Sequence, residues 1–121
     1  IALEGALKLM EMSQIVTQGF HPLEYRHGPI SLVDEGTAVV MLYSADQKTA
    51  ETLLVDELQQ KGATVIGFGG PGDLELTVDC DPALAGLCVL PALQVLGERA
   101  AQAKGVDTVS PRHLTKVVML G

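Results

Sequence analysis

The order of hydrophobic and polar residues predicts a helix at the start of this chain. Residues 1–17 have the spacing of an amphipathic helix, and Gly19 and Pro22 should end it. Its apolar stripe, which we expect beside the core, consists of Leu3, Leu7 and Met10. The neighbouring stripe is charged and consists of Glu4, Lys8 and Glu11.

The middle of the chain predicts a strand, a helix and a second strand. Residues 37–43 and 63–68 are short apolar runs typical of strands buried on both faces. Between them, residues 46–61 predict a helix capped by Asp46, with Glu51 on its exposed side. Such a unit is right-handed and has a parallel sheet. Residues 74–78 predict a third strand, at the edge.

The chain after the strands is strongly apolar. Residues 84–104 predict a helix buried on most of its surface, and Pro91 should kink it or mark its true start. The residues after Gly105 are too irregular to assign. Together these patterns predict one domain of the α/β class.

Composition narrows the choice of partners. With 121 residues and 47% hydrophobic content, the chain can build one core. Its 8 basic and 15 acidic residues give a net charge of −7, so neither nucleic acid nor an anionic membrane is an expected partner. No apolar run approaches the roughly 20 residues of a membrane span. Without a secretory signal, Cys80 and Cys88 are expected to be reduced thiols of a cytoplasmic protein.

Two motifs that suggest ligands have simpler explanations. Gly67, Gly69 and Gly72 match a dinucleotide fingerprint, but a strand-like segment follows where phosphate binding needs a helix, so we expect a glycine-rich turn. The histidines and cysteines lack the paired spacing of a zinc site, and we predict no metal.

Three charged features can each be structural or functional. The charged stripe can be a surface ladder of ion pairs. His27 lies in a polar stretch, residues 23–29, of the kind that carries chemistry in loops, but it can equally bond a backbone carbonyl. Lys116 can be a solvated lysine of the tail.

Taken together, three sequence blocks resemble the sugar isomerase (SIS) domain family. The blocks are EGALKLME at residues 4–11, EYRHGP at 24–29 and PRHLTKVV at 111–118. They are most similar to the C-terminal SIS domain of glucosamine-6-phosphate synthases (glutamine–fructose-6-phosphate aminotransferases) and to related phosphosugar isomerases and deaminases. The resemblance implies a three-layer α/β sandwich with a parallel, flavodoxin-like sheet.

The start of the chain predicts a piece of a longer protein. It begins at Ile1 with neither an initiator methionine nor a helix-capping residue. We therefore expect residues 1–121 to be a truncated C-terminal SIS domain without its first strand, ending in a catalytic tail at about 106–121. The resemblance implies that an upstream SIS domain supplies the phosphate-binding loop.

The resemblance also implies the roles of five residues. Glu11 matches the carboxylate that moves a proton between C1 and C2, and His27 matches the ring-opening histidine. Lys116 matches the lysine that forms an imine with the open-chain ketone. Lys8 and Thr115 match substrate-binding positions. No cofactor is implied.

These roles predict aldose–ketose isomerisation of a hexose or aminohexose 6-phosphate, with or without amino transfer or deamination. Burial against Leu7 and Met10 would raise the pKa of Glu11 toward working pH. Relatives share the active site across a homodimer, so we expect the isolated chain to be inactive. The alternative is a SIS module that binds a sugar phosphate and regulates a partner without turnover.

Overall fold

The computed structural model describes residues 1–109, which form two compact units. One unit spans residues 20–88 and contains the sheet. The other joins residues 1–19 to residues 89–109 and contains most of two long helices. Each unit is described by itself.

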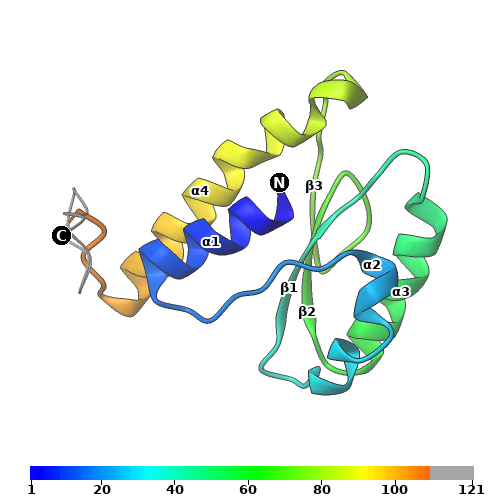
Figure 1. Cartoon of the computed structure of the whole chain (residues 1–121), viewed down its shortest axis with the longest axis horizontal. Helices are drawn as coiled ribbons and strands as arrows, with labels where there is room; N and C mark the ends of the chain where they lie inside the picture. Colours follow the sequence, from blue (N-terminus) through cyan, green and yellow to red (C-terminus); the bar gives the residue numbers. More distant parts are fainter. Residues whose placement is uncertain (110–121) are drawn as a thin grey trace, which may run out of the picture. The chain divides into compact units, whose positions relative to one another are not determined.

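The sheet is parallel, with strand order β1-β2-β3 (Figure 1). Its strands are β1 (Ala38–Leu42), β2 (Thr64–Phe68) and β3 (Leu74–Leu76). Ala38 lies opposite Thr64, and Ile66 lies opposite Leu74. Helix α3 (Lys48–Gln60) connects β1 to β2, so the predicted strand–helix–strand unit and its parallel pairing are confirmed.

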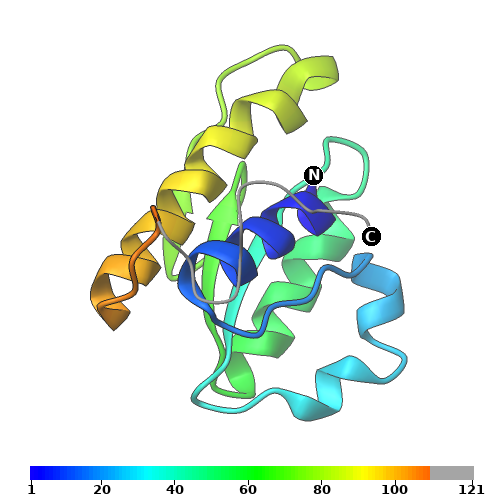
Figure 2. The ribbon, with the colours of Figure 1, turned by 60° about the vertical axis from the view of Figure 1, so that its left-hand side comes forward.

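Helix α3 covers the sheet with its apolar side, and Figure 2 shows the helix running beside the strands. The buried core residues are Met41, Leu54, Val55, Leu58, Ala63 and Val65. Two details of the prediction are wrong. Asp46 does not cap the helix, whose N-cap is Gln47. Glu51 is 5% exposed, because its two carboxylate oxygens accept hydrogen bonds of 2.8 Å from the amide and hydroxyl groups of Ser44.

The glycine-rich segment is a turn, as predicted, since it leads into β3 and not into a helix. A Cβ atom at Gly67 would collide with the carbonyl oxygens of Gly70 and Pro71, so the loop folds tightly over the end of β2. The Asp73 carboxylate fixes the return by accepting a 2.7 Å hydrogen bond from the Val65 amide. That bond also lowers the pKa of Asp73.

The helical unit consists of α1 (Ala2–Ser13) and α4 (Ala85–Lys104), which lie side by side (Figure 1). Glycines set the contact between them. A Cβ at Gly5 would lie 2.6 Å from Leu93 Cδ1, and one at Gly97 would lie 3.4 Å from Met12 Sδ. Large side chains at either glycine would therefore push the helices apart.

The face of α1 that packs is not the predicted one. The buried positions are Gly5 and Ser13, whereas Leu3, Leu7 and Met10 are 73%, 44% and 43% exposed. At about 100° per residue, the stripe of large apolar residues lies roughly a third of a turn around the helix from the face that meets α4. The expectation that this stripe borders the core is wrong for the described residues.

Helix α1 ends earlier than predicted. Gln14 adopts a left-handed conformation (φ 55°), which terminates the helix at Ser13. Lys104 Nζ donates a 3.0 Å hydrogen bond to the Gln14 carbonyl, and the Thr17 hydroxyl donates to the Ala6 carbonyl. Tertiary contacts thus replace the last helical turn that the sequence pattern suggested.

Helix α4 is buried along one stripe only, contrary to prediction. That stripe is Val89, Leu93, Gly97 and Ala101, spaced four residues apart. Leu84, in the preceding 3₁₀ turn η2 (Pro82–Leu84), is exposed, as are Leu87 and Val95 on the helix. Pro91 lies inside the helix and does not mark its start.

The stretch Pro82–Lys104 is long and apolar enough to cross a membrane by length and composition alone. This differs from the expectation that no apolar run approaches that length. Core helices of soluble proteins that are mostly buried meet the same criterion, whereas 17% of the apolar window of this stretch is buried. Since the buried stripe of α4 packs on α1, its apolar character is explained in part by that contact.

Candidate functional site

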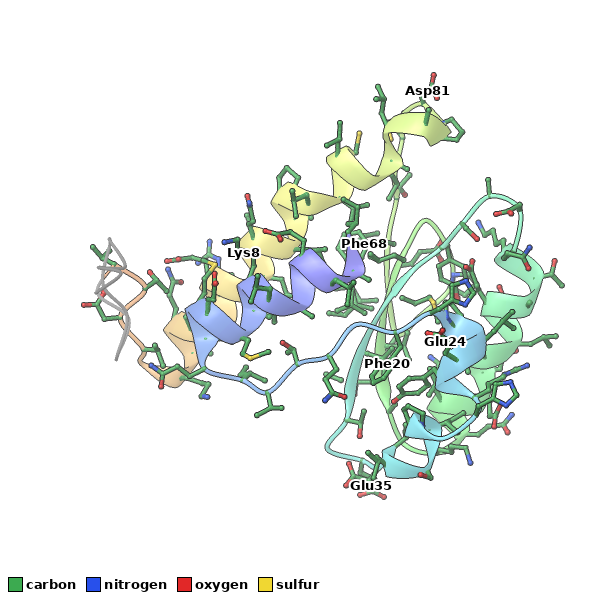
Figure 3. All side chains as sticks on the ribbon, viewed as in Figure 1. Lys8, Phe20, Glu24, Glu35, Phe68 and Asp81 are labelled. Atoms are coloured by element: carbon green, nitrogen blue, oxygen red, sulfur yellow. The ribbon has the colours of Figure 1, made fainter. Side chains whose placement is uncertain are left out.

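The charged stripe on α1 forms a connected set of ion pairs around Lys8, whose side chain is labelled in Figure 3. Lys8 Nζ donates a 3.1 Å hydrogen bond to Glu11 Oε2 and lies 4.0 Å from Glu4 Oε1. The hydrogen bond to Glu11 is the main cause of the raised pKa of Lys8. Lys8 is therefore an ammonium group at neutral pH.

The sequence suggested that Glu11 is buried, but in the structure it is not. Its side chain is 41% exposed, and Leu7 and Met10 are themselves largely exposed. Burial among these neighbours does not occur within the described residues, so that expectation is wrong. Glu11 Oε1 makes no hydrogen bond within residues 1–109.

His27 lies between two short helical turns, α2 (Pro22–Tyr25) and the 3₁₀ turn η1 (Pro29–Leu32), where we predicted a polar loop. Its side chain is exposed and makes no hydrogen bond within the described part of the chain. The alternative of a histidine bonded to a carbonyl is therefore not observed. Its backbone amide donates to the Glu24 carbonyl at 3.1 Å.

Neighbouring residues hold the His27 segment against the sheet unit. Tyr25 and Ile30, on either side of His27, pack against the core cluster. The ring of Phe20, labelled in Figure 3, meets the Tyr25 ring edge to face, with centroids 5.3 Å apart. The segment is thus anchored while its imidazole stays in solvent.

Arg26 adds an anchor that sequence reasoning missed. Arg26 Nε lies 3.5 Å from Glu57 Oε2 on α3, which ties the His27 segment to the helix behind the sheet. Both side chains are about 40% exposed, so the pair orients the segment more than it stabilises the fold. The sequence indicated this ion pair only weakly, because Arg26 and Glu57 lie far apart in the chain.

The structure brings together only part of the predicted set. Lys8 and Glu11 are hydrogen-bonded on one helix, and His27 belongs to the other unit. Thr115 and Lys116 lie outside the described residues. Among residues 1–109, no group of three histidine, cysteine or acidic side chains is arranged to hold a metal ion.

The features of the two units define a class of protein. The sheet unit has a parallel α/β fold and carries a histidine that is exposed within residues 1–109, and the helical unit carries a lysine–carboxylate pair. The chain belongs to the SIS domain family, whose model matches residues 1–81. This confirms the family predicted from the three sequence blocks.

Known relatives extend over nearly the whole chain. The isomerizing glutamine–fructose-6-phosphate aminotransferase of Methanosarcina acetivorans is 40% identical over 98% of this chain. The corresponding enzyme of Chlorobaculum tepidum is 35% identical over the same share. The chain spans 21% of the length of each of these proteins.

Solved structures confirm the fold class. Glucosamine-6-phosphate deaminase from Thermotoga maritima superposes with a TM-score of 0.83 and 40% identity, covering 98% of this chain and 36% of that one. The C-terminal domain of glucosamine-fructose-6-phosphate aminotransferase from Francisella tularensis superposes with a TM-score of 0.71 and 31% identity. The match covers 88% of this chain and 33% of that one. The chain therefore has the parallel, flavodoxin-like α/β fold of SIS domains.

Proposed function

We propose that the protein containing this chain isomerises a hexose or aminohexose 6-phosphate between ketose and aldose forms, with or without amino transfer or release. The observation that carries this proposal is the hydrogen-bonded Lys8–Glu11 pair on α1. It occurs in a chain whose relatives are named as fructose-6-phosphate aminotransferases and a glucosamine-6-phosphate deaminase.

The pair suits proton transfer between adjacent carbons. Isomerisation removes a proton from one carbon and returns it to the next, through an enediol or enamine-like intermediate. We assign Glu11 as the carboxylate that carries the proton, through its free oxygen Oε1. The Lys8 ammonium beside it holds the carboxylate and can stabilise negative charge that develops on substrate oxygens.

The remaining roles involve residues from other parts of the chain. An exposed imidazole can both donate and accept a proton, which supports His27 as the group that opens the sugar ring. Lys116 as the imine-forming amine and Thr115 as a substrate contact stay predictions, since both lie outside the described residues.

Partners complete the proposed site. We infer a cytoplasmic homodimer in which the histidine of one subunit serves the other, and an upstream SIS domain that binds the phosphate. The exposed apolar side chains of α1 and α4 support such neighbours, because large apolar patches on a protein surface mark contact sites.

The first test is Glu11→Gln in the full-length protein. Loss of the proton carrier should lower kcat for isomerisation by a factor of about 10²–10⁴, while sugar-phosphate binding changes little. Exchange of the C1 or C2 hydrogen with deuterated water measures the step directly. Glu4→Gln is the matched control, because Glu4 lies on the same stripe but 4.0 Å from Lys8. Turnover that survives in Glu11→Gln would contradict the proposal.

The second test uses the 121-residue chain alone. We expect no measurable isomerisation of fructose 6-phosphate, since the phosphate loop and the second subunit are needed. Adding the full-length Glu11→Gln protein tests whether a missing partner subunit is the reason that the isolated chain is inactive. Turnover by the isolated chain would disprove the shared-site proposal. If the intact protein binds the sugar phosphate without proton exchange, the regulatory SIS module is the better description.

A further inference from the structure

The ion pair between Arg26 and Glu57 joins the segment that carries His27 to a firmly held part of the sheet unit. Glu57 lies on α3 between Leu54 and Leu58, which are 2% and 1% exposed and fix the helix in the core. Arg26 ends the short helix α2, which lies beside α3 in Figure 1, and it directly precedes His27. The contact of Arg26 Nε with α3 is therefore one residue away from the candidate imidazole.

Local hydrogen bonds give the His27 segment its shape. The Glu24 carbonyl accepts a 3.1 Å hydrogen bond from the His27 amide. The Gly28 carbonyl accepts hydrogen bonds from the amide and the hydroxyl of Ser31, at 3.0 and 2.7 Å. Both partners of each bond lie within residues 24–31, so these bonds fix the turn itself and not its orientation on the sheet unit.

Tyr25, Arg26 and Ile30 connect the segment to the rest of the sheet unit. Tyr25 and Ile30 pack against the core cluster. Two apolar contacts let the segment rotate about the line that joins them, because such contacts are not directional. The contact between Arg26 and Glu57, at 3.5 Å, restricts that rotation beside His27.

We propose that Arg26 and Glu57 are positioning residues, which hold the His27 imidazole in the orientation that opens the sugar ring. This inference rests on the proposed function, which assigns ring opening to His27. It adds two residues to that reaction, neither of which needs to touch the substrate.

Ring opening is the step that depends on the place of the imidazole. In a ketose ring the C2–O5 bond breaks, its electron pair goes to O5, and O5 gains a proton while the C2 hydroxyl loses one to form the carbonyl. A group that moves these protons must lie about 2.6–3.2 Å from the oxygen concerned. A misplaced imidazole therefore slows ring opening and leaves the later proton transfer between C1 and C2 unchanged.

Two substrates separate the steps in the full-length protein. Fructose 6-phosphate must be opened, whereas 5-deoxyfructose 6-phosphate has no O5 hydroxyl and is always open. Arg26→Gln and Glu57→Gln should each lower kcat for fructose 6-phosphate by about twofold to fivefold, the range of an exposed ion pair. Neither change should affect the 5-deoxy substrate, and the double variant should be no slower than either single one.

Lys61→Gln is the matched control, because it removes one positive charge from an exposed residue at the end of α3. It should leave kcat for both substrates unchanged. Equal losses on both substrates in Arg26→Gln, or losses that add in the double variant, would overturn the proposal. A higher KM for both substrates in Arg26→Gln but not in Glu57→Gln would also overturn it, since Arg26 would then bind the phosphate directly.

Glu11→Gln separates a failure of this inference from a failure of the proposed function. Proton transfer follows ring opening, so Glu11→Gln should slow turnover of both substrates. If it slows neither, the proposed function is wrong, and the role of the ion pair with it. If it slows both while Arg26→Gln shows no loss specific to fructose 6-phosphate, the proposed function stands and the positioning role is wrong.

Hydrogen–deuterium exchange gives a readout that needs no turnover. In the full-length protein, peptides that cover residues 20–33 should exchange about twofold faster in Arg26→Gln, because the segment is then held less firmly. Lys61→Gln should leave this rate unchanged. The swapped pair, Arg26→Glu with Glu57→Arg, should restore both slow exchange and kcat. Unchanged exchange in Arg26→Gln, or no recovery in the swapped pair, would overturn the proposal.

Discussion

Helices α1 and α3 are both amphipathic, but the fold treats their apolar sides differently. On α3, Leu54, Val55 and Leu58 are buried in the core of its own unit. On α1, the large apolar side chains are exposed, and small residues make the buried contact. An apolar stripe therefore does not show by itself whether the helix buries that stripe within its own chain.

The difference separates a helix that completes a core from the helix that carries the proposed site residues Lys8 and Glu11. Helix α3 completes a core, and its buried Glu51 is fully occupied by Ser44. Helix α1 meets α4 closely through glycines, which leaves the Lys8–Glu11 pair and the apolar stripe free for other partners. Under our proposal that the site is shared between domains, the helix with unused surface is the one expected to carry the chemistry.

The largest effect on stability should come from the core side of α3. Leu58 is 1% exposed, so Leu58→Ala should lower the free energy of unfolding by about 2–5 kcal/mol through lost burial and a cavity. Leu53→Ala is the matched control, because Leu53 lies on the same helix and is 58% exposed. Urea denaturation measures both. Equal losses of unfolding free energy in Leu58→Ala and Leu53→Ala would mean that the two sides of α3 contribute equally to stability.

A smaller effect is expected at the glycine contact of α1. Gly5→Val should lower the free energy of unfolding by about 1–3 kcal/mol, because the added side chain meets Leu93. Leu93→Ala creates space, so the double variant should lose less than the sum of the single changes. Gly28→Val is the control, since a Cβ there has no neighbour within 4 Å. If the losses of the two single variants simply add in the double variant, residue 5 and Leu93 are not in direct contact.

The smallest effect is expected on the exposed stripe of α1. Leu7→Ser should change the stability of the 121-residue chain by no more than about 0.5 kcal/mol, as is usual for exposed positions. In the full-length protein the same change should cost more and weaken self-association, if neighbours cover the stripe. Thermal unfolding and sedimentation measure the two effects. A large loss already in the isolated chain would show that its own fold buries Leu7.

Much of the sheet unit could be predicted from sequence because its pattern is local. The apolar runs of β1 and β2 and the periodicity of α3 place each element within two residues of its observed bounds. The glycine turn was also predictable, since the residues after it favour a strand. The burial of Glu51 could not be predicted, because it depends on a hydrogen bond with Ser44. The two residues meet only when the strand and the helix come together.

The residues assigned to the candidate site stay predictions, but the structure shows that the surroundings of Glu11 differ from those expected. Sequence blocks pointed to Glu11 and His27, and the structure shows the exposure of both. The anchor between Arg26 and Glu57 could not be predicted, because no local pattern links two residues on separate elements. The prediction that Glu11 is buried was wrong for a related reason, since it assumed that the neighbouring apolar stripe faces inward.

By itself, the sequence determined the family, the α/β class and the order of helices and strands, because periodicity and turn residues act over short distances. Tertiary structure alone decided which face of each helix is buried. On α1, the closest approach to α4 is possible only where Gly5 leaves room for Leu93, so steric fit outweighed hydrophobicity. That choice leaves the side chains of Lys8 and Glu11 33% and 41% exposed.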